Sequence, residues 1–373
     1  MSSGYSLQFD LFSLMQMRDA TWTPRDVFDE VGDHIRIAEE AGFGTAWFGE
    51  HHFSNYSLCP SPLMAAAHFA GQTSRIRLGT GVVVLPLYEP IRLAQEIGMV
   101  DVLSDGRLVL GIGSGYQPYE FERFGMPLDE TVMERTLEAL DVIERAVTRE
   151  AFSFDGRYYS YPETSVASKM PGGRMPEVWI AGMHPDLLTR AVERDYGLLL
   201  TPSWKPTRDL QHVRTKLGDL CAGCGRDPAD QSVGLMRFIH VTESRSQAVD
   251  AAERARYSSR ASLSFRLGYG TMNGIFVDDL PAEGEPDIGD MVENYIIGDV
   301  DHCIEKILED HEAMGHSHVL CNVQLGGVPR ERALHTMEAL GADIIPGVRK
   351  AMRTDATDNN KAGATALPTA GAV

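Results

Sequence analysis

The strongest constraint on the fold is a repeated change between short apolar segments and amphipathic segments along the first 115 residues. Helical periodicity is clearest at 25–41, where Val27, Val31 and Ile35 fall on one face and Gly42 ends the segment. Two further helices are predicted at 62–74 and 91–104. Strands are predicted at the apolar segments that alternate with these helices, namely 5–14, 45–50, 76–85 and 107–115. Successive strand–helix units predict parallel strands joined by right-handed crossovers.

The alternation resumes after a predicted helix at about 129–150. Four more strands are predicted, at 177–183, 196–202, 232–242 and 318–325. Eight strands alternating with helices favour a (β/α)8 TIM barrel of the α/β class over an open, doubly wound sheet. Such a barrel has its active site at the carboxyl ends of the strands, so the segments that follow the strands are the candidates for function.

Three segments depart from the repeat. Residues 152–161 predict a β-hairpin with Asp155-Gly156 as its turn. Residues 257–294 form a long insertion after the seventh strand, rich in aromatic residues, glycine and acids, and we predict that they form a mobile lid. The small, polar segment 354–373 predicts a disordered tail, which leaves 1–353 as a single domain.

The acidic composition restricts the possible partners. A net charge of −19 repels nucleic acid and anionic membranes, so neither is expected as a partner. Five scattered cysteines fit a reduced compartment better than a disulfide framework. The N-terminus lacks a signal-peptide pattern and no segment has the length of a membrane span, so a cytoplasmic protein is expected.

The sequence FGEHHF at 48–53 places two histidines directly after the second predicted strand. Neighbouring residues of a strand point to opposite faces, so His51 and His52 are poorly placed to bind one metal ion. The CAGC sequence at 221–224 lacks a second ligand pair, and it is more typical of a helix end than of a metal or redox site. A buried structural pair remains an alternative for the histidines, but their position favours an imidazole that exchanges protons.

Two glycine-containing turns follow the fourth and fifth strands of the barrel, GIGSGY at 111–116 and AGMHPD at 181–186. The first is not a complete dinucleotide fingerprint. Glycine nevertheless lets a ligand approach the backbone, and the helix that starts in the second turn favours an anion. The two turns together predict a phosphorylated cofactor. Tyr116 and Trp204 are either ordinary core aromatics or walls for a flat heterocycle.

Three segments of the chain, EEAGFGTAWFGEHHF, RIRLGTGVVVLPLYEPIRLAQEIGMVDVLSDGRLVLGIGSGY and GDVDHCIEKILEDHEAMG, resemble the bacterial-luciferase-like family of flavin-dependent monooxygenases. The resemblance covers residues 5 to about 348. It implies that reduced FMN, supplied by a separate flavin reductase, binds at the barrel mouth. It also implies that the cofactor reacts with O2 through a flavin C4a-peroxide to oxidise a small organic substrate.

The resemblance assigns roles to individual residues. His51 matches the family's catalytic histidine, and Gly81 and Val82 match a pair joined by a non-prolyl cis peptide beneath the isoalloxazine. Gly113 lies where luciferase has a cysteine that faces the ring, and Trp204 matches a tryptophan beside the ring. The implied cofactor-binding residues are Gly81, Val82, Gly113, Ser114, Gly115, Tyr116, Ala181, Gly182, Met183, His184 and Trp204.

The implied phosphate site departs from luciferase. Ser114 stands where luciferase has an arginine, and Gly182 and Met183 replace a Glu-Ser pair. The phosphate is therefore expected on the backbone N–H groups of 114–115 and 182–184, with help from the Ser114 hydroxyl and from His184. Losing the arginine removes a bidentate contact, so the affinity for FMN is expected to be modest.

Two other functions remain open at this point. One is hydride transfer with coenzyme F420, which occupies the same barrel mouth in a related branch. The other is flavin binding without turnover, against which His51 and the long insertion argue. A homodimer through the helices after the second and third strands is also expected, because small residues at 65, 66, 67 and 70 permit close helix packing.

Overall fold

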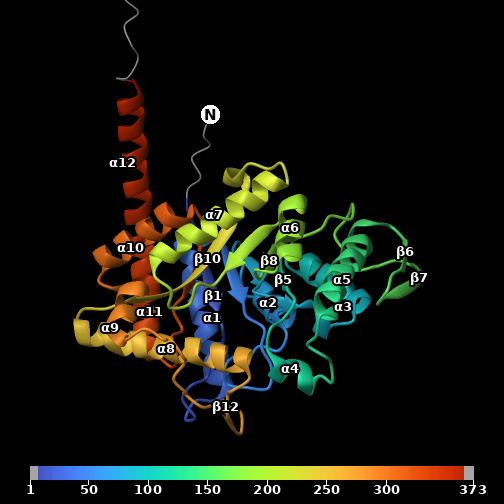
Figure 1. The fold of residues 1–373 in the computed structure, drawn as a ribbon, viewed down its shortest axis with the longest axis horizontal. Helices are drawn as coiled ribbons and strands as arrows, with labels where there is room; N and C mark the ends of the chain where they lie inside the picture. Colours follow the sequence, from blue (N-terminus) through green and yellow to red (C-terminus); the bar gives the residue numbers. More distant parts are fainter. Residues whose placement is uncertain (1–6, 365–373) are drawn as a thin grey trace, which may run out of the picture.

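The computed structural model describes residues 7–364, and of residues 355–364 only the backbone (Figure 1). Its centre is a closed barrel of parallel strands in which β1 pairs with both β2 and β14. The barrel strands are β1 (Gln8–Ser13), β2 (Thr45–Phe48), β3 (Arg77–Thr80), β5 (Leu108–Gly113), β8 (Glu177–Ala181), β9 (Gly197–Leu200), β10 (Val233–Val241) and β14 (His318–Asn322). The predicted (β/α)8 barrel is confirmed, and each of the eight predicted strands is present.

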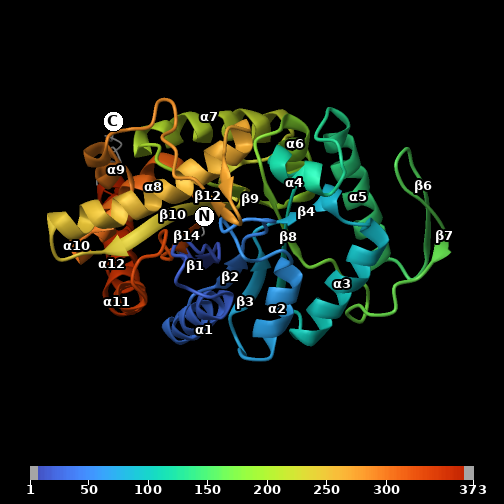
Figure 2. The same cartoon turned by 90° about the horizontal axis from the view of Figure 1, so that it is seen from below.

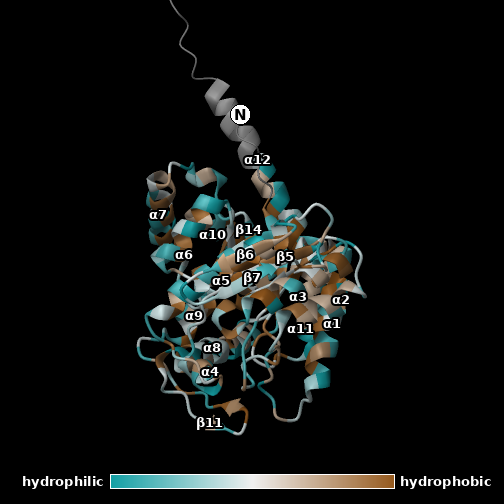
Figure 3. Ribbon diagram, turned by 90° about the vertical axis from the view of Figure 1, so that its right-hand side faces the viewer, coloured by the Kyte–Doolittle hydropathy of each residue, from teal (hydrophilic) through white to brown (hydrophobic). Residues whose placement is uncertain are grey.

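The helices form a ring outside the strands (Figure 2). They are α1 (Pro24–Ala41), α2 (Pro62–Ala70), α3 (Pro90–Leu103), α4 (Pro118–Arg123), α5 (Thr131–Thr148), α6 (Pro185–Arg194), α7 (Thr207–Gly223), α8 (Arg245–Leu267), α9 (Ile288–Asn294), α10 (Val300–Met314), α11 (Arg330–Ala339) and α12 (Ile345–Ala364), with short 3-10 or π turns at Leu85–Leu87, Pro228–Asp230 and Leu340–Ile344. Both hydropathy colours occur along the outer helices, as expected when only one face of each helix is turned to the barrel (Figure 3).

Two tryptophans fill the inside of the barrel and explain two of its glycines. Trp47 and Trp179 meet edge to face with ring centroids 5.7 Å apart. A Cβ on Gly79 would lie 2.4 Å from the Trp47 ring, and one on Gly197 would lie 2.2 Å from the Trp179 ring. These indoles therefore require glycine on the neighbouring strands. Outward-facing strand residues such as Leu11 pack against the helices in the main core.

Two predicted strand segments differ in detail. The segment 76–85 is split into β3 and β4 (Val83–Val84), and the Gly81–Val82 peptide bond between them is cis, as the resemblance implied. The hairpin forms from β6 (Phe152–Asp155) and β7 (Ser160–Thr164), but its connection spans 156–159 and not the two-residue Asp155-Gly156 turn. The longer loop forms because Glu138 on α5 accepts the backbone N–H groups of residues 157, 158 and 159.

The predicted insertion begins later than 257, since α8 continues without a break to Leu267. Ser244 caps the first turn of this helix and Gly268 ends it in the left-handed conformation. Beyond α8 the chain forms a small hairpin, β11 (Met272–Asn273) and β12 (Phe276–Val277), then α9, and then β13 (Ile296–Gly298), which pairs with the end of β10. The true loop is therefore 268–287.

The C-terminal segment also differs from the expectation. Helix α12 continues to Ala364, so residues 354–364 are helical where a disordered tail was predicted from 354. The remainder of that predicted tail, 365–373, lies outside the described residues. Between residues 7 and 364, no helix combines the length and apolar character needed to cross a membrane.

Candidate active site

His51 and His52 lie just past the end of β2, and each ring meets its own carboxylate. Nδ1 of His51 lies 3.0 Å from Oε1 of Glu120, which belongs to α4. The same Glu120 oxygen accepts the backbone N–H of His52 at 2.7 Å. Nε2 of His52 instead lies 2.9 Å from Oε1 of Glu50. The two imidazoles therefore diverge, as predicted for neighbours at a strand end.

The contacts of His52 are structural. Its partner Glu50 is buried, and its second oxygen accepts the backbone N–H of Val84 at 3.2 Å and the Tyr88 hydroxyl at 3.0 Å. Burial raises the pKa of Glu50, while the hydrogen bond from His52 opposes that shift. Together these groups tie the loop after β2 to β4.

The surroundings of His51 suit proton exchange. Its side chain is 12% exposed, and the amide of Gln117 lies 3.1 Å from Nδ1. The Tyr56 and Tyr116 rings lie 4.7 and 5.8 Å from the imidazole, measured between centroids. No described residue hydrogen bonds with Nε2. One ring nitrogen is thus oriented by the buried Glu120 carboxylate, and the other is available to a reacting molecule.

Four partly buried apolar side chains form a floor at the carboxyl end of the barrel. Phe12, Val82, Ala181 and Trp204 come from the ends of β1, β3, β8 and β9, and all four pack on the same interior cluster. We call this set the mouth floor. Three of its members, Val82, Ala181 and Trp204, were predicted to bind the cofactor.

Bare backbone borders the mouth floor. A Cβ on Gly113 would lie 2.9 Å from the Val82 side chain. Gly115 has φ +75°, and a Cβ there would lie 2.7 Å from Phe121 and 2.8 Å from Val84. Glycine is therefore required at Gly115 by both conformation and space. Apolar side chains beside glycine backbone that carries no Cβ fit the face of a flat heterocycle, so these residues suit the ring of a flavin or deazaflavin.

The predicted phosphate site lies at the outer edge of the mouth floor. Gly182 has φ +128° and leads into α6, while Met183 and His184 are exposed. Nδ1 of His184 accepts the N–H of Asp186 at 3.3 Å, so this ring caps the helix. The Ser114 hydroxyl donates weakly to the Gly115 carbonyl at 3.4 Å. Backbone N–H groups at both turns fit an anion, but the Asp186 carboxylate in the first turn of α6 opposes it.

The segment that contains Trp204 is held by contacts on the outer face of the barrel. The Trp204 carbonyl accepts the Asn294 side-chain amide at 2.9 Å, and the Asn294 carbonyl accepts a guanidinium N–H of Arg237. Nε of Arg237 lies 2.9 Å from Oδ2 of Asp310, and both side chains are almost fully buried. This chain of contacts fixes the position of the predicted ring-contacting tryptophan.

Sequence reasoning missed Glu120, Gln117 and Tyr56. Glu120 is 69 residues from His51 along the chain, and only the barrel brings the two together. The other sequence candidates behave as ordinary structure. Cys221 lies in the last turn of α7 and Cys224 caps it, and the five cysteines are free. Within residues 7–364, no three His, Cys, Asp or Glu side chains are grouped to hold a metal ion.

A parallel barrel whose mouth combines an apolar floor, glycine turns and a carboxylate-bound histidine has the features of an enzyme with its active site at the carboxyl ends of the strands. Sequence comparison identifies its family. The model of the luciferase-like monooxygenase family matches residues 7–317, so the chain belongs to this family and is one of its enzymes.

Similar proteins of known sequence support the assignment. The chain is 33% identical over 347 residues to the uncharacterised protein y4vJ of Sinorhizobium fredii, covering 93% of this chain and 99% of the relative. It is 25% identical to the oxygenase component of the flavin-dependent trigonelline monooxygenase of Acinetobacter baylyi, covering 91% and 95%. It is 24% identical to the alkanal monooxygenase alpha chain of the Kryptophanaron alfredi symbiont, covering 84% and 91%.

Similar solved structures show the same fold. The monooxygenase RslO1 of Streptomyces bottropensis has a TM-score of 0.78 at 21% identity, with 91% of this chain and 99% of that chain covered. The oxygenating constituent of 3,6-diketocamphane monooxygenase of Pseudomonas putida, in complex with FMN, has a TM-score of 0.73 at 22% identity, with 92% and 99% covered. An F420-dependent secondary alcohol dehydrogenase has a TM-score of 0.70 at 17% identity, with 92% and 99% covered.

Proposed function

We propose that the protein is the oxygenase component of a two-component, FMN-dependent monooxygenase that oxidises a small organic substrate. The observation that supports this most directly is His51, whose Nδ1 lies 3.0 Å from the buried Glu120 beside the mouth floor. When bound, reduced FMN would supply the two electrons with which O2 places one oxygen atom in the substrate and the other in water. A separate flavin reductase is the partner that would provide it.

Each group of residues has a distinct task in this proposal. The mouth floor, with Gly113 beside it, would support the flat ring. Backbone N–H groups of 114–115 and 182–184 would bind the phosphate. His51 would hold and return a proton through Nε2, because Glu120 orients the ring through Nδ1. The loop 268–287 would keep water away from the reacting atoms.

Two observations favour FMN over F420. The segments EHHF and TPSW, which follow β2 and β9, resemble the FMN-dependent branch of the family, and the trigonelline enzyme is a flavin-dependent relative. The similar F420-dependent dehydrogenase keeps hydride transfer as the second candidate. The two candidate reactions differ in whether they require O2. Monooxygenation consumes O2 with each turnover, whereas hydride transfer to or from F420 proceeds without it.

The decisive experiment titrates the protein anaerobically with reduced FMN and, separately, with reduced F420, and then admits O2. We expect saturable binding of reduced FMN and a slowed, protein-dependent reoxidation. Oxygenated product is expected when candidate nitrogen heterocycles, ketones or aldehydes are screened with a flavin reductase. Tight binding of F420 together with no effect on FMN reoxidation would instead establish the second candidate.

We also propose that the protein is a homodimer through α2 and α3. Ala66 and Ala70 do not support this contact, since both are buried against the barrel. Support comes from exposed apolar side chains on these helices. Met64 is 73% exposed, Met99 and Leu103 are each 54% exposed, and Val102 is 43% exposed. Large apolar side chains exposed on two adjacent helices are typical of a surface that meets another protein, and a second copy supplies the same surface.

A further inference from the structure

Asn322 is the last residue of β14, and its side chain has an unusual environment. The residue is only 1% exposed. Among the described residues, neither Nδ2 nor Oδ1 has a hydrogen-bond partner. Buried side-chain amides nearly always have partners, because removing an amide from water without replacing its hydrogen bonds is unfavourable. A carboxamide left in this state therefore indicates a partner that is supplied from outside the chain.

The strand register places Asn322 inside the barrel, in the layer nearest the mouth. Asn322 pairs with Phe238 of β10, and Leu320 pairs with Met236. Leu320 points inward, because a Cβ on the interior Gly234 would lie 2.8 Å from it. Strand residues two apart share a face, so Asn322 also points inward, one layer closer to the carboxyl end.

The same layer includes part of the mouth floor. Leu11 of β1 pairs with Cys321, so the next residue, Phe12, stands beside Asn322. The Phe12 ring is also the nearest neighbour of Gly81, where a Cβ would lie 3.1 Å from it. Asn322 therefore lies next to the surface on which the cofactor ring is proposed to rest. Phe12 is itself only partly buried, and we infer that its ring moves aside to expose the amide when the cofactor binds.

We propose that Asn322 binds the pyrimidinedione edge of the cofactor ring; this inference rests on the proposed function. A carboxamide presents an acceptor beside a donor. The imide edge of a flavin presents the complementary pair, an N–H beside a carbonyl. Oδ1 would accept from the imide N–H while Nδ2 donates to the neighbouring carbonyl, so both unpartnered atoms gain a bond. A deazaflavin has the same edge, so this contact recognises the ring system and leaves the choice of cofactor to other residues.

The test compares two flavin probes on the wild type and on three variants, Asn322→Leu, Asn322→Asp and the control Cys321→Ala. The probes are reduced FMN and reduced N3-methyl-FMN, which lacks the imide hydrogen, and the dissociation constants are measured anaerobically by quenching of the protein's tryptophan fluorescence. The wild type should bind FMN about tenfold more tightly than N3-methyl-FMN, as expected for one lost hydrogen bond. Asn322→Leu should lose about tenfold for FMN and should no longer distinguish the probes. Asn322→Asp keeps the size and the acceptor but replaces the donor with a charge, so it should also weaken FMN binding.

Thermal unfolding provides a readout apart from flavin binding. Ligand-free Asn322→Leu should melt no lower than the wild type, because an unpartnered amide has been removed. The matched control is Cys321→Ala, on the outward face of the same strand, which should lower the melting temperature and leave the preference between probes unchanged.

The outcomes separate this inference from the function on which it rests. If Asn322→Leu, or Asn322→Asp should the first variant not fold, binds FMN within twofold of the wild type and still distinguishes the probes, the amide serves an internal water and the inference is wrong. If the wild type binds neither reduced FMN nor reduced F420, the proposed function is wrong and this inference is overturned with it.

Discussion

His51 carries the chemistry proposed for this protein at the scale of a single residue. His51→Ala removes the imidazole and leaves the mouth floor intact. We expect product formation to fall by roughly 10²–10⁴-fold, the usual contribution of a positioned acid–base group, with little change in flavin affinity. Single-turnover reactions with reduced FMN, O2 and substrate would measure the loss of product formation. Near-normal coupled turnover in this variant would remove His51 from the mechanism.

Two neighbours of His51 provide matched controls. Glu120→Gln keeps the shape of the side chain but loses its charge, so it should lower the rate less than His51→Ala and shift the pH profile of product formation. If Glu120 had only a structural role, Glu120→Gln would lower the melting temperature and leave the pH profile of product formation unchanged. His52→Ala should affect the rate little and stability more, because His52 bonds the buried Glu50.

Glu30 on α1 predicts a pH dependence of stability. One of its oxygens accepts the Gln324 amide at 2.6 Å, and its other oxygen is buried without a partner among residues 7–364. Burial raises the pKa of Glu30 to about 7. The folded protein therefore retains a proton that the unfolded chain loses near pH 4.5, so stability should fall as pH rises from about 4.5 to 7 and then level off.

The size of this effect can be bounded. A shift from 4.5 to about 7 corresponds to at most roughly 3 kcal/mol of unfolding free energy. Glu30→Gln has no proton to lose, so denaturant titrations between pH 5 and about pH 8 should show a flatter dependence in the variant than in the wild type. Parallel pH curves for the two proteins would contradict the protonated Glu30.

The site residues differ in how far the sequence could reveal them. Gly81, Val82 and Trp204 were named from the family resemblance, and the structure places Val82 and Trp204 on one floor with Gly81 beside it. Glu120 was missed because its relation to His51 exists only across the barrel mouth. Asn322 was missed for a different reason, since an asparagine at the end of an apolar strand looks like a strand terminator until its unpartnered atoms are seen.

At the scale of elements, the segment after β10 shows where periodicity fails. Helix α8 continues through Ser258, Ser259 and Ser262, and the hydroxyl side chains hide the helical pattern. The contacts of this helix decide its conformation. Ser258 donates to Gln16 at 2.6 Å, and Ser259 accepts from Ser203 at 2.8 Å. Such partners lie far away in the sequence and could not be predicted from it.

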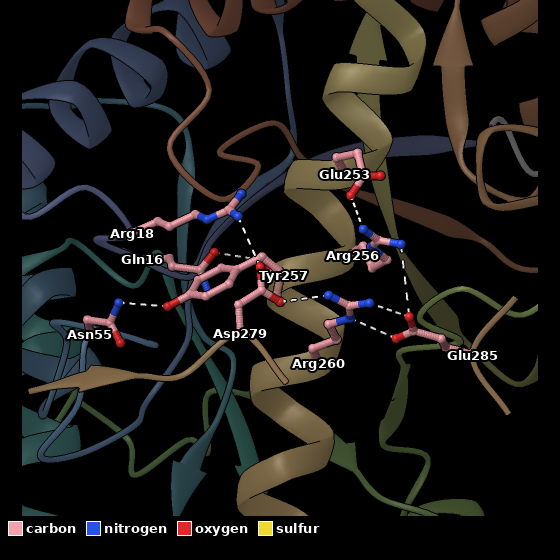
Figure 4. A network of polar contacts seen from close by, with 10 residues as sticks. Gln16, Arg18, Asn55, Glu253, Arg256, Tyr257, Arg260, Asp279 and Glu285 are labelled. Atoms are coloured by element: carbon pink, nitrogen blue, oxygen red, sulfur yellow. Dashed lines mark hydrogen bonds and ion pairs between the residues drawn. The ribbon is translucent and has the colours of Figure 1, made fainter. Parts of the chain in front are cut away.

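Residues 257–294 were predicted to form a mobile lid, and the structure anchors the loop 268–287 within them by polar contacts (Figure 4). Arg260 of α8 bonds Glu285 at 2.7 Å and Asp279 at 3.0 Å. Asp279 also pairs with Arg18 at 3.0 Å, and Asn55 accepts the N–H of Val277 at 3.0 Å. We predict that the loop opens more readily when these charges are screened or removed.

Arg260→Met tests this anchoring. It keeps the apolar stem and removes both carboxylate contacts, so we expect the loop to open and the fraction of O2 released as H2O2 to rise severalfold, with FMN affinity largely retained. Added salt should raise the H2O2 fraction of the wild type more than that of the variant. Arg245→Met is the matched control, because its pair with Glu293 is exposed and contributes little. Unchanged coupling in Arg260→Met would exclude the lid.

For the whole molecule, the barrel could be predicted because most residues of its strands are buried on both faces, so the strands appear as predominantly apolar segments. All eight were identified, since each apolar segment alternates with an amphipathic helix. The quaternary structure was predicted from weaker grounds. The small residues at 66 and 70 turned out to pack on the barrel, so a spacing argument could not tell an internal helix contact from an external one.

The net charge opposes the proposed dimer and the exposed apolar area favours it, and a change in salt concentration distinguishes the two effects. Two chains of net charge −19 repel each other, while Met64, Met99 and Leu103 favour contact. Sedimentation or light scattering should therefore show twice the mass of one chain, with tighter association as salt rises from about 50 to about 300 mM. Met99→Asp combined with Leu103→Asp should give monomers. Phe28→Asp on α1, which is 40% exposed but outside α2 and α3, should not. A wild type that stays monomeric at every protein and salt concentration would contradict the dimer and indicate that these exposed side chains meet a different partner.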